Sequence, residues 1–151
     1  MTSYELISII IALLAFFTSI FAVFLNNKKA SATIELTLNE RITTTKEKVS
    51  DVSLLMTPLI SKKQHDESEK NMLASYSKHF DLAIENNLNA YEEACAKYLD
   101  NKVDKVRFKK TYISEIRQVV ENVELKKYFD AVSSKYKAIL KVYYEWENHE
   151  K

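Results

Sequence analysis

The sequence predicts an all-α protein in which one N-terminal transmembrane helix continues into a cytoplasmic helical bundle. Three observations predict it: the 151 residues include no glycine and one proline, residues 6–25 carry no charge, and apolar residues beyond them recur every three or four positions. At ordinary abundance, a chain of this length would hold about ten glycines. Their absence excludes glycine-rich phosphate loops and dinucleotide-binding turns, which need residues that tolerate positive φ.

Residues 6–25 form the predicted membrane span. Fourteen of these twenty residues are Leu, Ile, Phe or Val. Twenty helical residues extend about 30 Å, which matches the hydrocarbon core of a bilayer. A cleaved signal peptide is the alternative, but it would carry a basic segment before its apolar run and a small-residue cleavage site after it. This chain has neither feature, so we expect the span to be retained.

The distribution of basic residues predicts the orientation of the span. Every Lys and Arg lies on its C-terminal side, beginning with Lys28 and Lys29 at the membrane exit. Because flanks rich in Lys and Arg stay in the cytoplasm, the N-terminus is expected outside and the C-terminal body inside. The chain is accordingly divided into a transmembrane anchor with its basic exit at 1–29, a membrane-proximal helix at 30–61 and a cytoplasmic helical bundle at 62–151.

The spacing of apolar residues predicts that the first helix continues out of the membrane. Through residues 26–57 the spacing stays at three and four, which is the helical period. Pro58 is expected to stop or kink the helix. The alternation of Ile34, Leu36 and Leu38 favours a strand instead, but the sequence contains no second strand-like run to pair with it. Helix is therefore the preferred interpretation.

Three further helices are expected after a polar loop at residues 62–68. Asp66 and Glu69 resemble a capping pair for a helix that runs to about Leu99, and Asp104 can cap the next one. The expected buried positions are Phe108, Tyr112, Ile116, Val119 and Val123 in the third helix of the body, and Val132, Tyr136, Ile139, Tyr143 and Trp146 in the last. Antiparallel helices with short connections normally pack into a bundle.

The span carries a face of small residues. Ser8, Ala12, Ala15, Ser19 and Ala22 recur at intervals of four, three, four and three, so they share one side of the helix. Small side chains let helices approach closely in lipid, and we expect identical copies to associate there. If the copies close into a ring, Thr18 and the serines are the only polar groups available to an otherwise aliphatic opening, which would gate by dewetting. The alternative is a span that only tethers the bundle to lipid.

Few residues indicate chemistry. His65, His79 and His149 have no acidic or cysteine partner at ligand or triad spacing, and Cys95 lies on an apolar helix face. Glu92 and Glu93 are expected on a solvated face, while the C-terminal aromatics, including Tyr144, are expected to be core and interface anchors. Beyond the span, 22 basic and 20 acidic side chains nearly balance, which argues against a general nucleic-acid surface. We expect no enzyme, no metal and no cofactor.

Arg117 and Asn122 are the weak catalytic candidates. An arginine followed by a polar residue and, after several positions, a histidine is the pattern of the HEPN ribonuclease superfamily, whose helical bundles pair two such motifs. In this chain Asn122 stands where the histidine would be. Asparagine cannot shuttle a proton near neutral pH as imidazole does. A structural role at a helix end is the expected one for both residues.

The layout resembles small bacterial single-span defence proteins. The features that carry the resemblance are the uncharged N-terminal span, the exit sequence from Asn27 to Leu36, and the stretches at 89–100, 108–112 and 115–122. The chain is most similar to the accessory membrane proteins of type VI-B CRISPR systems, which have a degenerate HEPN-like bundle. This resemblance implies assembly into a pore in the inner membrane and a stronger RNA-guided antiphage response through depolarisation of the infected cell.

The expected function is therefore a homo-oligomeric inner-membrane pore or permeability effector. Its expected partners are membrane lipid, further copies of itself in a ring, and a pathway with an RNA-guided nuclease. Two alternatives belong to other classes: a membrane-tethered HEPN-like bundle that binds or cleaves RNA through Arg117, and a holin-like protein. A holin does not need a cytoplasmic body of this size.

Overall fold

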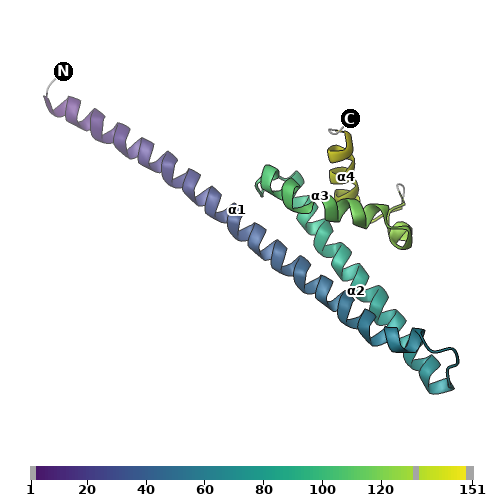
Figure 1. Cartoon of the computed structure of the whole chain (residues 1–151). Helices are drawn as coiled ribbons and strands as arrows, with labels where there is room; N and C mark the ends of the chain where they lie inside the picture. Colours follow the sequence, from purple (N-terminus) through teal and green to yellow (C-terminus); the bar gives the residue numbers. More distant parts are fainter. Residues whose placement is uncertain (1–2, 131–132, 149–151) are drawn as a thin grey trace.

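The computed structural model describes residues 3–130 and 133–148, and these residues are all-α. The elements in chain order are α1 (Ser3–Ile60), α2 (Glu67–Leu99), α3 (Lys105–Glu121), the 3-10 helix η1 (Val123–Tyr128) and α4 (Lys137–Asn148). Figure 1 shows α1 as a long rod, with α2 antiparallel to its C-terminal half and the shorter helices gathered beside them. The N-terminal part of α1 projects alone from this body.

The first helix is continuous over 58 residues, which confirms the helical interpretation of residues 26–57 and excludes the strand alternative. The expected stop at Pro58 is displaced, because α1 contains the proline and ends two residues later at Ile60. Pro58 has no N–H to donate to the carbonyl of Leu54, so the last turn of α1 lacks one helical hydrogen bond. Ser61 then donates its N–H to the carbonyl of Thr57 at 3.1 Å, and the chain reverses.

The reversal into α2 uses the predicted capping pair. The side chain of Asp66 accepts a hydrogen bond from the N–H of Glu69 at 2.8 Å, and Glu69 accepts one from the N–H of Asp66 at 3.2 Å. This reciprocal arrangement is a capping box, which satisfies two donors that a helix start leaves free. In the loop before it, Nε2 of His65 lies 2.6 Å from the carbonyl oxygen of Leu59 and ties the loop to the end of α1.

The core lies where α1, α2, α3 and α4 meet. Leu38 and Ile42 of α1 belong to the same buried cluster as residues from α2, α3 and α4. Aromatic rings fill its centre: Tyr98 stands edge-on to Trp146 with centroids 5.4 Å apart, and Phe108 lies 5.4 Å from Tyr98. Burial of such large rings is the main source of stability for a body of this size. The part of α1 beyond its apolar start is therefore an integral part of the bundle core.

Three positions in the body differ from the expectation. Val123 is 84% exposed, because α3 ends at Glu121 and the chain turns into η1. Tyr136 is buried but precedes α4, and Tyr144 is 53% exposed and so is no core anchor. Val132 lies outside the described residues. The apolar period of the sequence predicts one helical turn too many at Val123, because Asn122 ends the helix before it.

Glu92 also departs from its expected solvated position. It is half-buried, and its two carboxylate oxygens accept the N–H groups of Ala138 and Ile139 at 2.8 and 3.0 Å. These donors belong to the first turn of α4, which leaves them without intrahelical partners. Glu93, the next residue, does lie near the surface, where it pairs with Arg41 of α1.

Candidate functional site

The apolar start of α1 is the most conspicuous surface of the molecule. Every residue from Ile7 to Leu25 is exposed, including Phe17 at 64% and Phe21 at 61%. The helix is long and apolar enough to cross a membrane, and none of its most apolar window is buried within the chain. A core helix of a soluble protein would bury such side chains. This segment must therefore be covered by something other than the rest of the described chain.

The predicted face of small residues is fully exposed on this segment. Its members are Ser8, Ala12, Ala15, Ser19 and Ala22, with Thr18 beside them. The hydroxyls of Thr18 and Ser19 donate to the carbonyl oxygen of Ala15 at 2.9 and 2.8 Å. Because each hydroxyl finds its partner inside its own helix, lipid exposure leaves no unpaired donor there. The face is thus narrow, as close helix contact requires, and the hydroxyls of Thr18 and Ser19 are satisfied within the helix.

Lys28 and Lys29 mark the end of the apolar segment. Both are exposed, and the ammonium of Lys28 lies 4.9 Å from the ring centroid of Phe24. A lysine folded back over an aromatic ring pairs a cation with a ring surface and places both at one level of the helix. Such a pair suits the boundary between hydrocarbon and headgroups, where aromatic and basic residues concentrate.

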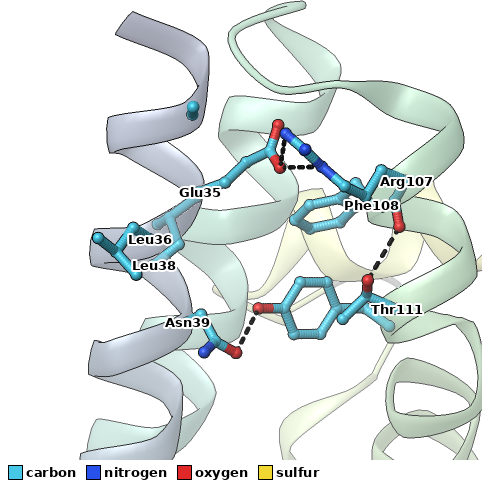
Figure 2. A pocket seen from close by; sticks show the side chains of 9 residues that line it. Glu35, Leu36, Leu38, Asn39, Arg107, Phe108 and Thr111 are labelled. Atoms are coloured by element: carbon cyan, nitrogen blue, oxygen red, sulfur yellow. Dashed lines mark hydrogen bonds and ion pairs between the residues drawn. The ribbon is translucent and has the colours of Figure 1, made fainter. Parts of the chain in front are cut away.

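A hollow of about 400 Å³ lies between α1 and α3 (Figure 2). Glu35 of α1 accepts from Nε of Arg107 at 2.6 Å and from the N–H of Asp104 at 2.8 Å. One turn further, the hydroxyl of Tyr112 donates to Oδ1 of Asn39 at 3.2 Å. The side chain of Glu35 is only 17% exposed, so this contact is well shielded. The hydrogen bonds of Glu35 and Asn39 around the hollow therefore link α1 to α3.

Neither HEPN-like candidate is presented as a free reactive group. Arg117 donates from Nε and Nη2 to Oε1 of Glu147 at 2.9 and 2.6 Å, which links α3 to α4. Asn122 ends α3, and its Oδ1 accepts the N–H of Glu124 at 2.8 Å, which starts η1. Both side chains thus hold helices in place, as a structural role at the helix end requires.

The remaining candidates are likewise engaged in structure. Cys95 is completely buried, and burial raises the pKa of its thiol, which keeps it in the unreactive form. His79 lines a shallow groove between α1 and α2, and His149 lies outside the described residues. Across residues 3–130 and 133–148, no group of three His, Cys, Asp or Glu side chains is arranged to hold a metal ion.

Comparison with known proteins adds no identification. No protein family, no curated protein and no solved structure matches this chain. The surfaces that the sequence predicted, namely the apolar segment, its small-residue face and the exit lysines, are present and exposed. The contacts of Glu35 and of Glu92 were not foreseen. Each joins residues more than 40 positions apart, and a single sequence carries no signal for such a pair.

Proposed function

We propose that this chain is a single-pass inner-membrane protein that assembles into a homo-oligomeric pore or permeability effector. The observation that carries the proposal is the lone, fully exposed apolar segment of α1, which continues without interruption into the core of the body. Lipid covers most of that segment, and the narrow face at Ala12, Ala15, Ser19 and Ala22 packs against a neighbouring copy in the ring.

The exit lysines support the orientation. Lys28 and Lys29 follow the apolar segment directly, while the short segment before it contains no basic residue. The excess of positive charge keeps this side in the cytoplasm, so the N-terminus lies outside and the helical body inside. In this arrangement the body is held close to the inner leaflet by one continuous helix.

A ring of these spans would enclose a mostly aliphatic opening. Thr18, beside the packed face, is a polar group available to this opening, and its hydroxyl, like that of Ser19 on the packed face, is bonded to the carbonyl oxygen of Ala15. A narrow opening of this kind excludes water in its resting state and conducts when neighbouring helices separate slightly. The cytoplasmic bodies hold the copies in register and receive the activating signal.

The cellular role we propose is to strengthen RNA-guided antiphage immunity by depolarising the infected cell. Its support is the resemblance in layout to the accessory membrane proteins of type VI-B CRISPR systems. A ribonuclease role has less support. Arg117 forms an ion pair with Glu147, and Asn122 accepts a hydrogen bond from Glu124 at the junction of α3 and η1. An RNA-cleaving bundle would need a proton-transfer group at this place, and an amide does not supply one.

The decisive experiment compares two spans that differ in where bulk is added. Ala12→Ile with Ala15→Ile places bulky side chains on the small-residue face and so prevents close contact between helices. Leu13→Phe adds bulk to the face turned toward lipid instead. We expect the double variant to lower the mass of the complex in mild detergent and to abolish activation-dependent loss of membrane potential, with Leu13→Phe behaving as wild type. Single copies of the wild-type chain in mild detergent, or an intact potential in cells that the protein protects from phage, would overturn the proposal.

A separate assay distinguishes the ribonuclease alternative. Arg117→Ala and Asn122→Ala are introduced singly, and decay of cellular RNA is followed beside membrane potential. Unchanged RNA decay in both variants supports the pore. Loss of RNA decay together with loss of protection would assign the function to the bundle and overturn the pore proposal.

A further inference from the structure

The start of α3 and the turn before it concentrate positive charge. Residues 97–110 contain six basic and two acidic side chains, a net charge of +4, in a chain whose net charge is +1. Of the six, Arg107 is paired with Glu35. The described parts of the chain contain no ion pair to Lys102, Lys105, Lys109 or Lys110. Most of this positive charge is therefore available to a ligand.

An apolar hollow lies among these lysines. Its volume is about 480 Å³, and it is lined by Tyr98, Lys105, Val106, Lys109, Lys110 and Ile113. Val106 is 82% exposed, and the ammonium of Lys105 lies 4.8 Å from the ring centroid of Tyr98. An apolar floor with a cationic rim fits a ligand that is apolar at one end and anionic at the other.

The contacts of Glu35 place this surface at the end of the body nearest the apolar segment. Both Asp104 and Arg107 bond to Glu35, so the first turn of α3 lies beside residue 35 of α1. In Figure 2, Arg107 lies above Thr111 just as Glu35 lies above Asn39. The two helices therefore run in the same direction, away from the membrane, and α3 begins at its membrane-facing end.

The distance to lipid follows from the helix rise. Ten residues separate Leu25 from Glu35, which corresponds to about 15 Å along α1. The headgroup layer occupies about 5–8 Å of that length. The start of α3 is therefore about 7–10 Å from the headgroups, which is close to one Debye length at physiological ionic strength. A transmembrane tilt of about 20° toward the side of α3 brings Lys102 and Lys105 nearer to the headgroups. Lys109 and Lys110 lie about one helical turn farther along α3.

We propose that the lysine surface, defined as Lys102, Lys105, Lys109 and Lys110 around Val106, docks on anionic phospholipid headgroups of the leaflet that α1 enters. The ammonium groups bind the lipid phosphates, and Val106 with the hollow behind it contacts the apolar part of the interface. The inference rests on the proposed membrane insertion of α1 and is independent of pore formation. Nucleic acid fits less well, because its phosphates leave the exposed Val106 without a partner.

The test uses the full chain reconstituted into two kinds of vesicle, one of phosphatidylcholine alone and one that also contains phosphatidylglycerol. Val106→Cys carries a bimane fluorophore, and brominated lipids report its contact with the bilayer. Cys95 is completely buried and so does not compete for the label. We expect several-fold stronger quenching in the anionic vesicles, with the difference reduced by added salt.

Matched charge reversals provide the control. Lys105→Glu, Lys109→Glu and Lys110→Glu together are expected to abolish the additional quenching. Lys63→Glu, Lys70→Glu and Lys78→Glu change the net charge equally, but they lie in the loop and on α2, toward the far end of the hairpin (Figure 1). We expect this second triple variant to quench as strongly as the unreversed protein.

Each contrary result has a separate meaning. Equal quenching in both vesicles, or quenching that survives reversal of the lysine surface, overturns the docking proposal while membrane insertion stands. Loss of quenching on addition of a short RNA would assign the surface to nucleic acid and also overturn it. Extraction of the unreversed chain from vesicles by alkaline carbonate would overturn both this inference and the proposed function.

Discussion

Glu92 of α2 closes the N-terminus of α4 by accepting the N–H of Ile139 at 3.0 Å, while its other oxygen accepts the N–H of Ala138. A carboxylate at this place bonds donors that the helix cannot satisfy and also interacts favourably with the positive end of the helix dipole. The cap comes from another helix, so it orients α4 as well as stabilising it. α4 carries Trp146, which is 2% exposed and fills the centre of the core.

Removal of this cap should loosen α4. We expect Glu92→Ala to lower the free energy of unfolding by about 1–2 kcal/mol, and Glu92→Gln, which keeps one acceptor oxygen, to lower it by less. Urea unfolding followed by Trp146 fluorescence measures both. The control is Glu93→Ala, which removes a surface pair with Arg41 and should cost about 0.5 kcal/mol or less. Equal losses at positions 92 and 93 would contradict the assigned cap.

The contact between Glu35 and Arg107 should be energetically coupled. Glu35→Gln, Arg107→Met and the double variant form a cycle from which we expect a coupling of about 0.5–1 kcal/mol, because Glu35 is shielded although Arg107 is 59% exposed. Lys127 and Asp81 provide a matched cycle, since both side chains are more than half exposed. Their coupling should be close to zero. A coupling energy for Lys127 and Asp81 that exceeds the one for Glu35 and Arg107 would contradict the prediction that shielding of Glu35 strengthens its ion pair.

The thiol of Cys95 should be protected in the folded protein. It is completely buried and its pKa is raised by burial, so a thiol-specific disulfide reagent should react only after the bundle opens. Colour release from the wild-type chain in detergent should begin at the urea concentration that unfolds it. The Val106→Cys variant, with its added thiol at an exposed position, should react at once under native conditions. Immediate reaction of the wild type would show that the core is open.

The capping box at the start of α2 should weaken in acid. A hydrogen bond from Lys62, supplemented by the N–H of Asp66, lowers the pKa of Glu69 below its ordinary value of 4.5. A carboxyl with a lowered folded pKa stabilises the fold above its unfolded pKa, and this contribution is lost as pH falls through the folded pKa. The amide resonance of Asp66 should therefore titrate with a midpoint below 4.5 and should lose this transition in Glu69→Gln. A midpoint at or above the ordinary value would exclude the bonded carboxylate.

Local signals in the sequence were sufficient for the helices and for two of their starts. Asp66 and Asp104 were expected as caps, and each accepts backbone N–H groups within three residues of itself. Short-range bonds of this type depend only on residue type and spacing. The candidate membrane span before residue 26 is also predictable from the sequence, since length and composition alone define it.

Contacts between residues far apart in the chain could not be predicted from such local signals. Glu92 sits beside Glu93 in the sequence, and nothing in that order says that one caps α4 while the other meets Arg41. Likewise, no local feature around Glu35 predicts its bond with Arg107, which lies 72 positions later. The unexpected η1 arises where Asn122 bonds the N–H of Glu124 and so diverts a pattern that otherwise continued as α-helix.

The unbroken backbone of α1 makes it a mechanical lever. The helix is about 87 Å long, and its fulcrum lies at Leu38 and Ile42, where the core grips it. One arm reaches about 30 Å to Ile60 and the other about 50 Å to Ile7. A force that swings the free tip of the hairpin sideways therefore displaces the outer end of the rod in the opposite direction and by a larger amount. Displacement at the Ile60 end is thus carried to the apolar end by α1 alone.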